Sequence, residues 1–207
     1  MPVTELALVR FKATEEPPSA AVKERLRAAQ QGQSEYSKYP VTFFSQTEDS
    51  SFVYLLGGWE SVEVHTNDWI TSATNQRLLG VFAEDLSVEW MFHLNLDVLA
   101  CIIRHPLEAP VVAIARFFVE PSKKAEFETT LAAGLTHLGA YIAPLTYAGG
   151  WRLDKEGEDE EYVLFTGWNS VEDHFKFAET ESFKEYAKIK PLLKGSEIKH
   201  GRVEKWE

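Results

Sequence analysis

The chain has 207 residues and a formal net charge of −11, so its surface is expected to repel phosphate backbones and no nucleic-acid partner is predicted. Hydrophobic residues make up 44% of the chain, enough for a packed core and against intrinsic disorder. The single cysteine, Cys101, excludes an intramolecular disulfide and suits a reducing compartment. No secretory signal is visible in Met1–Ala13, and the apolar runs are shorter than the roughly 20 residues that cross a bilayer. We therefore expect a cytoplasmic protein with no membrane partner.

Runs rich in β-branched and aromatic residues predict strands, and helical periodicity predicts helices. In each half of the chain these patterns follow one another in the order strand, helix, strand, strand, helix, strand. Ser19 and Ser122 are the expected N-caps of the first helices, and Ser61 and Ser170 those of the second. The expected strands are 5–12, 41–47, 52–59 and 88–98 in the first half, and 111–119, 147–153, 162–168 and 197–206 in the second. The expected helices are 19–31 and 122–138, then 61–69 and 170–177, with a further helical piece after each of the last two.

An eight-residue segment occurs twice. Gly58–His65 returns as Gly167–His174 at a constant offset (168 − 59 = 109). This period is too long for a solenoid, whose units have roughly 20–50 residues. It indicates a duplicated domain, with a first repeat at 1–98, a linker at 99–110 and a second repeat at 111–207.

The predicted strands are apolar on both faces, as in Phe52–Leu56, which is typical of a sheet covered on both sides. The element order of each half is that of a ferredoxin-like βαββαβ unit. Since helices cover only one face, the other face needs a partner, and the duplicated half can supply it. The predicted fold class is α+β, with two ferredoxin-like halves whose antiparallel sheets face each other in a pseudo-dimeric α+β barrel. Further homodimerisation is left open.

The motif Gly-Trp-x-Ser-x-Glu, at 58–63 and 167–172, together with Phe-Lys-Glu at 183–185, resembles the antibiotic-biosynthesis-monooxygenase-like domains of the dimeric α+β barrel superfamily. The resemblance covers the chain once per half and extends to tandem versions found in fungi. It implies a fold that hosts cofactor-free oxygenases, haem-degrading enzymes and polyketide cyclases. Haem degradation is not expected, because the haem-ligating histidine of that group falls near Gly80 and Lys188.

The candidate catalytic residues are His65 and His174. Helical spacing places each on the same face as a valine, Val62 or Val171, so both histidines are expected to point toward the sheet. An inward histidine is either a hydrogen-bonded core residue or a proton-transfer group in a cavity. Both alternatives stay open on the sequence.

Three tryptophans are candidate ligand-binding residues. Trp59 and Trp168 end the third strands, where they either anchor the sheet or wall a pocket for a flat aromatic ligand. Trp69 follows in the first repeat, and Ala178 occupies the aligned position in the second. If Trp69 lines a pocket, the two pockets differ.

The last strands carry His93 and His200. Alternation places His93 and Asn95 on one face, where they form either a polar row against a ligand cavity or a solvated edge. The first strand of each half contains an Arg-Phe pair, at an offset of 106 (116 − 10), and Arg10 and Arg116 also count as ligand-binding candidates. Because arginine is rarely buried unpaired, each is expected to meet a carboxylate, Glu63 or Glu172 being the candidates, or to bind an anionic ligand.

No zinc-type Cys-His spacing, phosphate-binding loop or nucleophile-base pair is found, so no metal and no cofactor are predicted. The leading hypothesis is a protein that binds a small aromatic or polyketide-like molecule, as a cofactor-independent monooxygenase or cyclase with histidine-assisted proton transfer. The alternative is a non-catalytic ligand-binding or stress-response barrel with structural histidines. A third hypothesis makes one half degenerate, with the first repeat as the better site.

Overall fold

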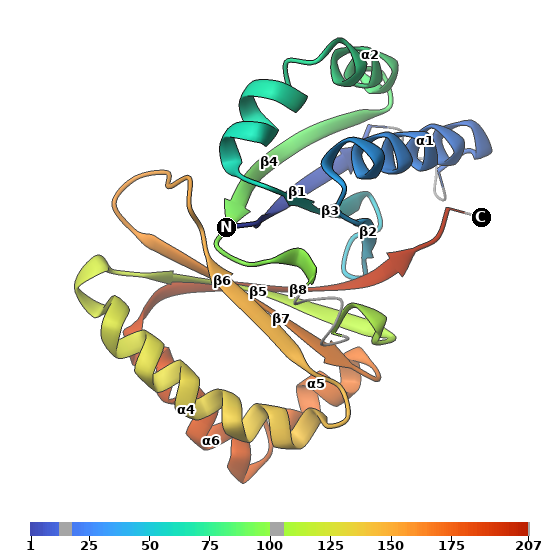
Figure 1. Ribbon diagram of the computed structural model, residues 1–207. Coiled ribbons are helices and arrows are strands. Elements are labelled where there is room, and N and C mark those ends of the chain that lie inside the picture. Colours follow the sequence, from blue (N-terminus) through green and yellow to red (C-terminus); the bar gives the residue numbers. More distant parts are fainter. Residues whose placement is uncertain (13–17, 100–105, 207) are drawn as a thin grey trace. The chain divides into compact units, whose positions relative to one another are not determined.

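The computed structural model describes residues 1–12, 18–99 and 106–206 (Figure 1). Cys101 and half of the predicted linker lie outside these ranges. The chain divides into two compact units, the first comprising Met1–Leu99 with Gly201–Glu207 and the second comprising Ala100–His200. None of the helices in the described ranges is long and apolar enough to cross a membrane.

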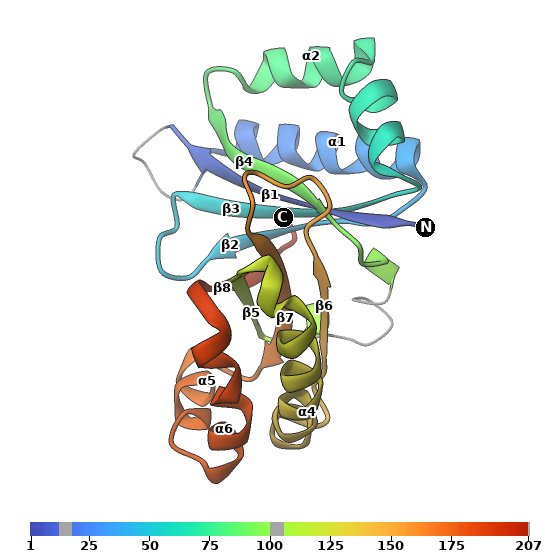
Figure 2. The same cartoon turned by 90° about the vertical axis from the view of Figure 1, so that its left-hand side faces the viewer.

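The first unit has four strands in the order β4-β1-β3-β2, and residues 201–204 of β8 pair with β2. Helices α1 and α2 cover one face of these strands (Figure 1, Figure 2). The bounds are β1 (Val3–Phe11), α1 (Ala20–Ser37), β2 (Val41–Gln46), β3 (Phe52–Trp59), η1 (Val64–Trp69), α2 (Ala73–Phe82) and β4 (Leu86–Leu94).

The second unit has the strand order β8-β5-β7-β6, with α4, α5 and α6 over one face (Figure 1). Hydrogen bonding through β8 gives one eight-stranded sheet, and the fold class is α+β. The bounds are η2 (Pro106–Glu108), β5 (Val111–Val119), η3 (Pro121–Lys123), α4 (Lys124–Ile142), β6 (Tyr147–Trp151), β7 (Glu160–Trp168), α5 (Val171–Phe177), α6 (Glu181–Tyr186), η4 (Ala187–Leu192) and β8 (Leu193–Glu204).

Three of the four predicted helix caps are confirmed. The hydroxyl oxygens of Ser19, Ser61 and Ser170 each accept a bond from the backbone N–H three residues later, at 3.1–3.3 Å. The cap predicted at Ser122 is wrong. That residue lies inside the 3₁₀ turn η3, which starts at Pro121, so α4 begins two residues later without a side-chain cap.

The predicted second helix of the first repeat is not a regular α-helix. Its main part, η1, is a π-helix in which the backbone N–H of Ile70 donates to the carbonyl oxygen of His65, five residues earlier, at 2.9 Å. Such π-helical turns are rare and are concentrated at functional sites. The structure therefore singles out the segment that carries His65 and Trp69.

Strand register corrects one alignment made on the sequence. Val3 lies opposite Trp59, and Val111 lies opposite Trp168. The first strands of the two units therefore correspond at an offset of 108 (111 − 3), whereas the two Arg-Phe pairs are separated by 106 (116 − 10). Arg10 and Arg116 are consequently not equivalent residues.

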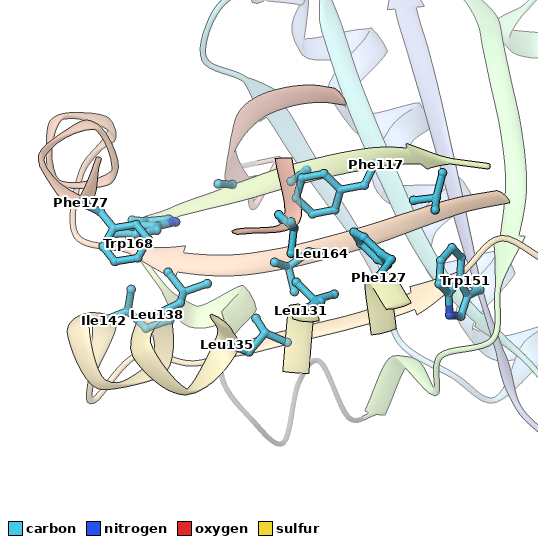
Figure 3. Packing of buried hydrophobic residues seen from close by; sticks show 14 of the residues in the cluster. Phe117, Phe127, Leu131, Leu135, Leu138, Ile142, Trp151, Leu164, Trp168 and Phe177 are labelled. Atoms are coloured by element: carbon cyan, nitrogen blue, oxygen red, sulfur yellow. The ribbon is translucent and has the colours of Figure 1, made fainter. Parts of the chain in front are cut away.

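The apolar cores of the two units are organised differently. In the second unit a large cluster of buried side chains joins β5, β6 and β7 to α4 and α5 (Figure 3). Its largest members include Phe127, Trp151, Trp168 and Phe177. In the first unit, the buried side chains that pack beside α1 and η1 include two separate clusters, one around Phe43, Val53 and Trp206 and the other around Val3, Trp59 and Trp69.

Candidate functional site

A cavity of about 310 Å³ lies in the first unit, between the sheet and the helices that cover it. Its walls come from β1, β2, β3, β4, α1, η1 and α2, and members of both apolar clusters line it. The lining is mainly apolar, and its polar side chains are Glu5, Gln33, His65 and Asn75. An apolar pocket of this size with a few converging polar groups is typical of a small-molecule site.

Glu5 is the charged residue on the face of β1 that lines the cavity, where it alternates with Ala7, Val9 and Phe11. Its side chain is buried, and its Oε2 accepts hydrogen bonds from two donors, Trp59 Nε1 at 2.8 Å and Gln33 Nε2 at 2.7 Å.

Burial raises the pKa of Glu5 above the ordinary value of 4.5. The bond from Trp59, the charge of His93 and the bond from Gln33 oppose this rise in pKa without cancelling it. Glu5 thus has the shifted pKa and the cavity position expected of a group that exchanges protons.

His65 is held on two sides and is buried. Its Nδ1 lies 2.7 Å from His93 Nε2, and its ring stacks on Trp59 with centroids 4.2 Å apart and planes 9° from parallel. Its Nε2 lies 3.7 Å from Glu5 Oε2, too far for a hydrogen bond but within ion-pair distance if the ring is protonated. The Nε2 edge of the imidazole therefore lies at the polar end of the cavity, near Glu5. The stacking on Trp59 and the contact with His93 hold the ring in this orientation.

The second unit repeats this arrangement of one tryptophan and two histidines. His174 Nδ1 lies 2.7 Å from His200 Nε2, and the rings of Trp168 and His174 stack at 4.4 Å with planes 20° apart. His174 is only partly buried. The hydrogen-bond acceptor of the tryptophan differs, because Trp168 Nε1 donates to Thr166 Oγ1 at 2.7 Å.

Two paired positions explain the difference in acceptor. Glu5 lies opposite Gly57 in the first unit, and at the same register Ala113 lies opposite Thr166 in the second. A Cβ on Gly57 would lie 2.6 Å from Gln33 Nε2 and 3.1 Å from Glu5 Oε2, so glycine leaves room for their hydrogen bond. The acceptor for the indole N–H thus comes from the first strand in one unit and from the third strand in the other.

Trp69 lines the cavity, and its counterpart in the second unit is Phe177 rather than Ala178. The ring contacts that identify this correspondence are Trp69–Tyr36 at 4.9 Å and Trp69–Trp59 at 6.0 Å, against Phe177–Tyr141 at 5.0 Å and Phe177–Trp168 at 5.9 Å. The offset falls from 109 at His65 to 108 at Trp69 (177 − 69). The first unit therefore has one extra residue in this segment, which the π-helical turn accommodates.

Of the predicted ligand-binding residues of the first unit, Trp69 lines the cavity, whereas Trp59, His93, Asn95 and Arg10 are not part of its lining. Asn95 is exposed, just beyond the end of β4. Arg10 is also exposed, and its guanidinium lies 5.5 Å from the ring centroid of Phe52. The polar row expected from His93 and Asn95 is therefore not formed, because the strand ends between them.

Arg116 lies in the second unit and pairs with two carboxylates. Its Nε is 2.5 Å from Glu161 Oε1, and its Nη1 is 3.1 Å from Glu197 Oε2. The expected pairing of this arginine is confirmed, but its partners lie on the neighbouring strands and not on the helix that carries Glu172. The ion pairs account for its burial.

The sequence reasoning did not select Glu5 or Gln33. A signal for Glu5 was present, since it is the charged residue on an otherwise apolar face of its strand, with Ala113 at the matching place in the second repeat. The offset of 106 taken from the Arg-Phe pairs hid this match. No comparable signal marked Gln33, because a glutamine on a helix is ordinary at an exposed position.

Within the described parts of the chain, no group of three or more His, Cys, Asp or Glu side chains is arranged to hold a metal ion. The side chains that gather at the cavity are suited instead to hydrogen bonding and proton transfer.

No protein-family model and no curated protein matches this sequence. Several solved structures share its fold. One is a protein of Fusobacterium nucleatum named "Putative monooxygenase", with 10% identity, a TM-score of 0.66, and coverage of 98% of this chain and 92% of that one. Another is an anthrone oxidase-like protein, with 14% identity, a TM-score of 0.67, and coverage of 98% and 91%.

A third similar structure is chlorite dismutase from Candidatus Nitrospira defluvii, in complex with imidazole. It has 11% identity, a TM-score of 0.63, and coverage of 99% of this chain and 92% of the other. At these identities the likeness concerns the fold alone, which is of the α+β barrel type in these proteins.

Proposed function

We propose that the first unit binds a small, mainly apolar molecule in its cavity and exchanges a proton with it through His65, as a cofactor-independent monooxygenase or cyclase. One observation carries this proposal: an apolar cavity of about 310 Å³ ends at two buried ionisable groups, Glu5 and His65. Fold likeness to proteins named as a monooxygenase and as anthrone oxidase-like is compatible with it.

The surroundings of His65 suit a general base. If its Nδ1–H donates to His93 Nε2, the lone pair of His65 Nε2 is directed to the polar end of the cavity and can take a proton from the ligand. The resulting imidazolium would be stabilised by the face of Trp59, on which it stacks. The ligand carbanion left behind could then react with molecular oxygen or close a ring.

Anthrone is the first compound to test, because an anthrone oxidase-like protein shares the fold. Its oxidation in air consumes one oxygen molecule and releases one water for each anthraquinone formed. We expect the protein to accelerate this reaction and His65→Ala to slow it by about 100-fold or more. His174→Ala, which removes the same kind of stacked histidine from the second unit, serves as the matched control and should leave the rate unchanged. A rate that does not depend on His65 would contradict the catalytic proposal.

A second candidate function is ligand binding without catalysis, with both histidine pairs structural. It is favoured by the recurrence of the Trp–His–His arrangement in the second unit, where Trp168 also belongs to a cluster of buried side chains. In that case ligands bind the first unit, and neither histidine variant changes the fate of the bound ligand. Analysis of the ligand after incubation with the protein separates the two functions.

We also propose that the two units are copies of one ferredoxin-like, antibiotic-biosynthesis-monooxygenase-like domain, related to tandem proteins of fungi, and that their sheets face each other in a pseudo-dimeric barrel. The repeated segment and the matched side-chain arrangements support common descent of the units. A cytoplasmic location belongs to the same proposal. An experimental structure in which the sheets do not face each other would contradict the barrel.

A further inference from the structure

The two carboxyl oxygens of Glu5 have different surroundings. Both hydrogen-bond donors that reach this side chain, Trp59 Nε1 and Gln33 Nε2, donate to Oε2. Within the described residues no hydrogen bond to Oε1 is found, although Glu5 lines the cavity. Oε1 is therefore the oxygen that a ligand would meet.

The donors also decide where a proton on this carboxyl would lie. An oxygen that accepts two N–H bonds has its lone pairs engaged, so the proton of the neutral acid is placed on the other oxygen, Oε1. The cavity lining favours the neutral acid, because it is mainly apolar and, among the described residues, includes neither lysine nor arginine. Burial accordingly raises the pKa of Glu5.

The groups around Glu5 come from four elements. The titratable ones are His65 from η1 and His93 from β4, and the neutral ones are Gln33 from α1 and Trp59 from β3. A charge on either histidine would favour the ionised carboxylate, whereas burial favours the neutral acid as the larger effect.

We propose that Glu5 is a hydrogen-bond donor to the ligand, giving its Oε1 proton to a carbonyl oxygen, so that the first unit selects flat aromatic ketones over hydrocarbons of the same shape. This inference rests on the proposed function of the cavity and names its substrate class. A donor at the carbonyl oxygen stabilises the enolate that forms when a C–H conjugated with that carbonyl is deprotonated, as at the ring carbon of anthrone opposite its carbonyl.

The opposite protonation state makes a different prediction. An ionised Glu5 would accept hydrogen bonds only and would prefer a ligand with a hydroxyl group. Three compounds with nearly the same tricyclic shape separate these cases: fluorene has no oxygen, fluorenone has a carbonyl group and fluorenol has a hydroxyl group. Their affinities can be measured by equilibrium dialysis with the full-length protein.

The decisive variant is Glu5→Gln, which copies the neutral acid. Its amide oxygen can accept from Trp59 and Gln33, while its NH₂ group donates into the cavity. We expect the native protein to bind fluorenone about tenfold more tightly than fluorene, as one added hydrogen bond allows. Glu5→Gln should keep this preference, and Glu5→Leu should abolish it. In the native protein, but not in Glu5→Gln, the preference should decline as the pH rises through the pKa of Glu5.

Equal binding of fluorene and fluorenone would overturn the inference and leave the ligand-binding function standing. A preference for fluorenol that Glu5→Gln destroys would overturn it as well, by showing an ionised carboxylate. If none of the three compounds binds, both the inference and the proposed function fail. Should Glu5→Leu not fold, the native protein, Glu5→Gln and the pH series decide the matter without it.

Discussion

The two units share a strand arrangement and a Trp–His–His arrangement, yet they fill the space beside the sheet differently. In the second unit a cluster of buried side chains packs between the sheet and its helices, and Figure 3 shows most of its members. In the first unit two separate clusters of buried side chains lie beside α1 and η1, and members of both line a cavity of about 310 Å³. The features that the units share are therefore compatible with either a packed core or a cavity.

Three differences between the units lie at the cavity. They are Glu5 and Gly57 against Ala113 and Thr166, and the π-helical segment that positions Trp69. The tryptophan and the two histidines occur in both units, and in the first unit His65 also lines the cavity. The unshared side chains, Glu5 above all, give the first unit its polar cavity end.

The largest effect is expected from placing the carboxylate in the second unit. Ala113 is 1% exposed within the packed cluster, so Ala113→Glu buries a carboxyl group without a partner. The free energy of unfolding should fall by about 3–5 kcal/mol, measured by urea denaturation. Ala113→Ser is the control for a small polar change. A loss below about 1 kcal/mol would show that the second unit also has room for a carboxylate, which would contradict the proposed difference in packing between the two units.

A matched pair of alanines tests the difference in packing. Ala7 lines the cavity of the first unit, and Ala115, at the same register, lies in the cluster of the second. Ala115→Leu should destabilise the protein by about 1–3 kcal/mol through overpacking. Ala7→Leu should be neutral or stabilise it by about 1 kcal/mol, because the added methyl groups enter the cavity. Equal costs in urea denaturation would indicate equally filled units.

The exchange of hydrogen-bond acceptors can be reproduced by mutation. Glu5→Ala leaves the N–H groups of Trp59 and Gln33 without their acceptor and should cost about 1–3 kcal/mol. Adding Gly57→Thr supplies a hydroxyl where the second unit has Thr166, and part of the loss should be recovered. Gly57→Thr alone is the control, and it should destabilise because its Cβ would crowd Gln33. Failure of the double variant to exceed Glu5→Ala in thermal stability would contradict this account of the two positions.

The smallest effect concerns pH. Because the pKa of Glu5 is raised in the folded state, the stability that its neutral form contributes is complete below the unfolded value of 4.5 and is lost as the pH rises through the folded value. The Tm of Glu5→Gln minus the Tm of the native protein should therefore increase as the pH rises from 4.5. Glu126→Gln, at an exposed position, should show no such trend. A Tm difference that is constant with pH would show that the pKa of Glu5 is not raised.

Much of the fold could be predicted from the sequence, because periodicity and capping are local properties. The eight expected strands are all present, and the helix caps at Ser19, Ser61 and Ser170 are confirmed. The inward direction of His65 follows from the same local pattern and is also confirmed. Its bond to His93 was not predicted, since it depends on strand register.

The cavity could not be predicted, because it depends on volumes summed over seven elements. Glu5 was read as the start of a strand, although its burial and its partner Gln33, 28 residues away, make it central to the site. The counterpart of Trp69 was misassigned to Ala178, because the extra residue in the π-helical segment shifts the alignment by one. Sequence comparison between repeats needs the register before it can identify functional differences.

The most direct test is the stoichiometry and location of ligand binding. Equilibrium dialysis of fluorenone against the native protein should give one bound molecule per chain. Binding should disappear in Ala7→Leu, which fills the cavity, and persist in Ala115→Leu, which alters the equivalent place in the second unit. Binding that Ala7→Leu leaves unchanged, or that Ala115→Leu abolishes, would contradict the proposal that the ligand occupies the cavity of the first unit.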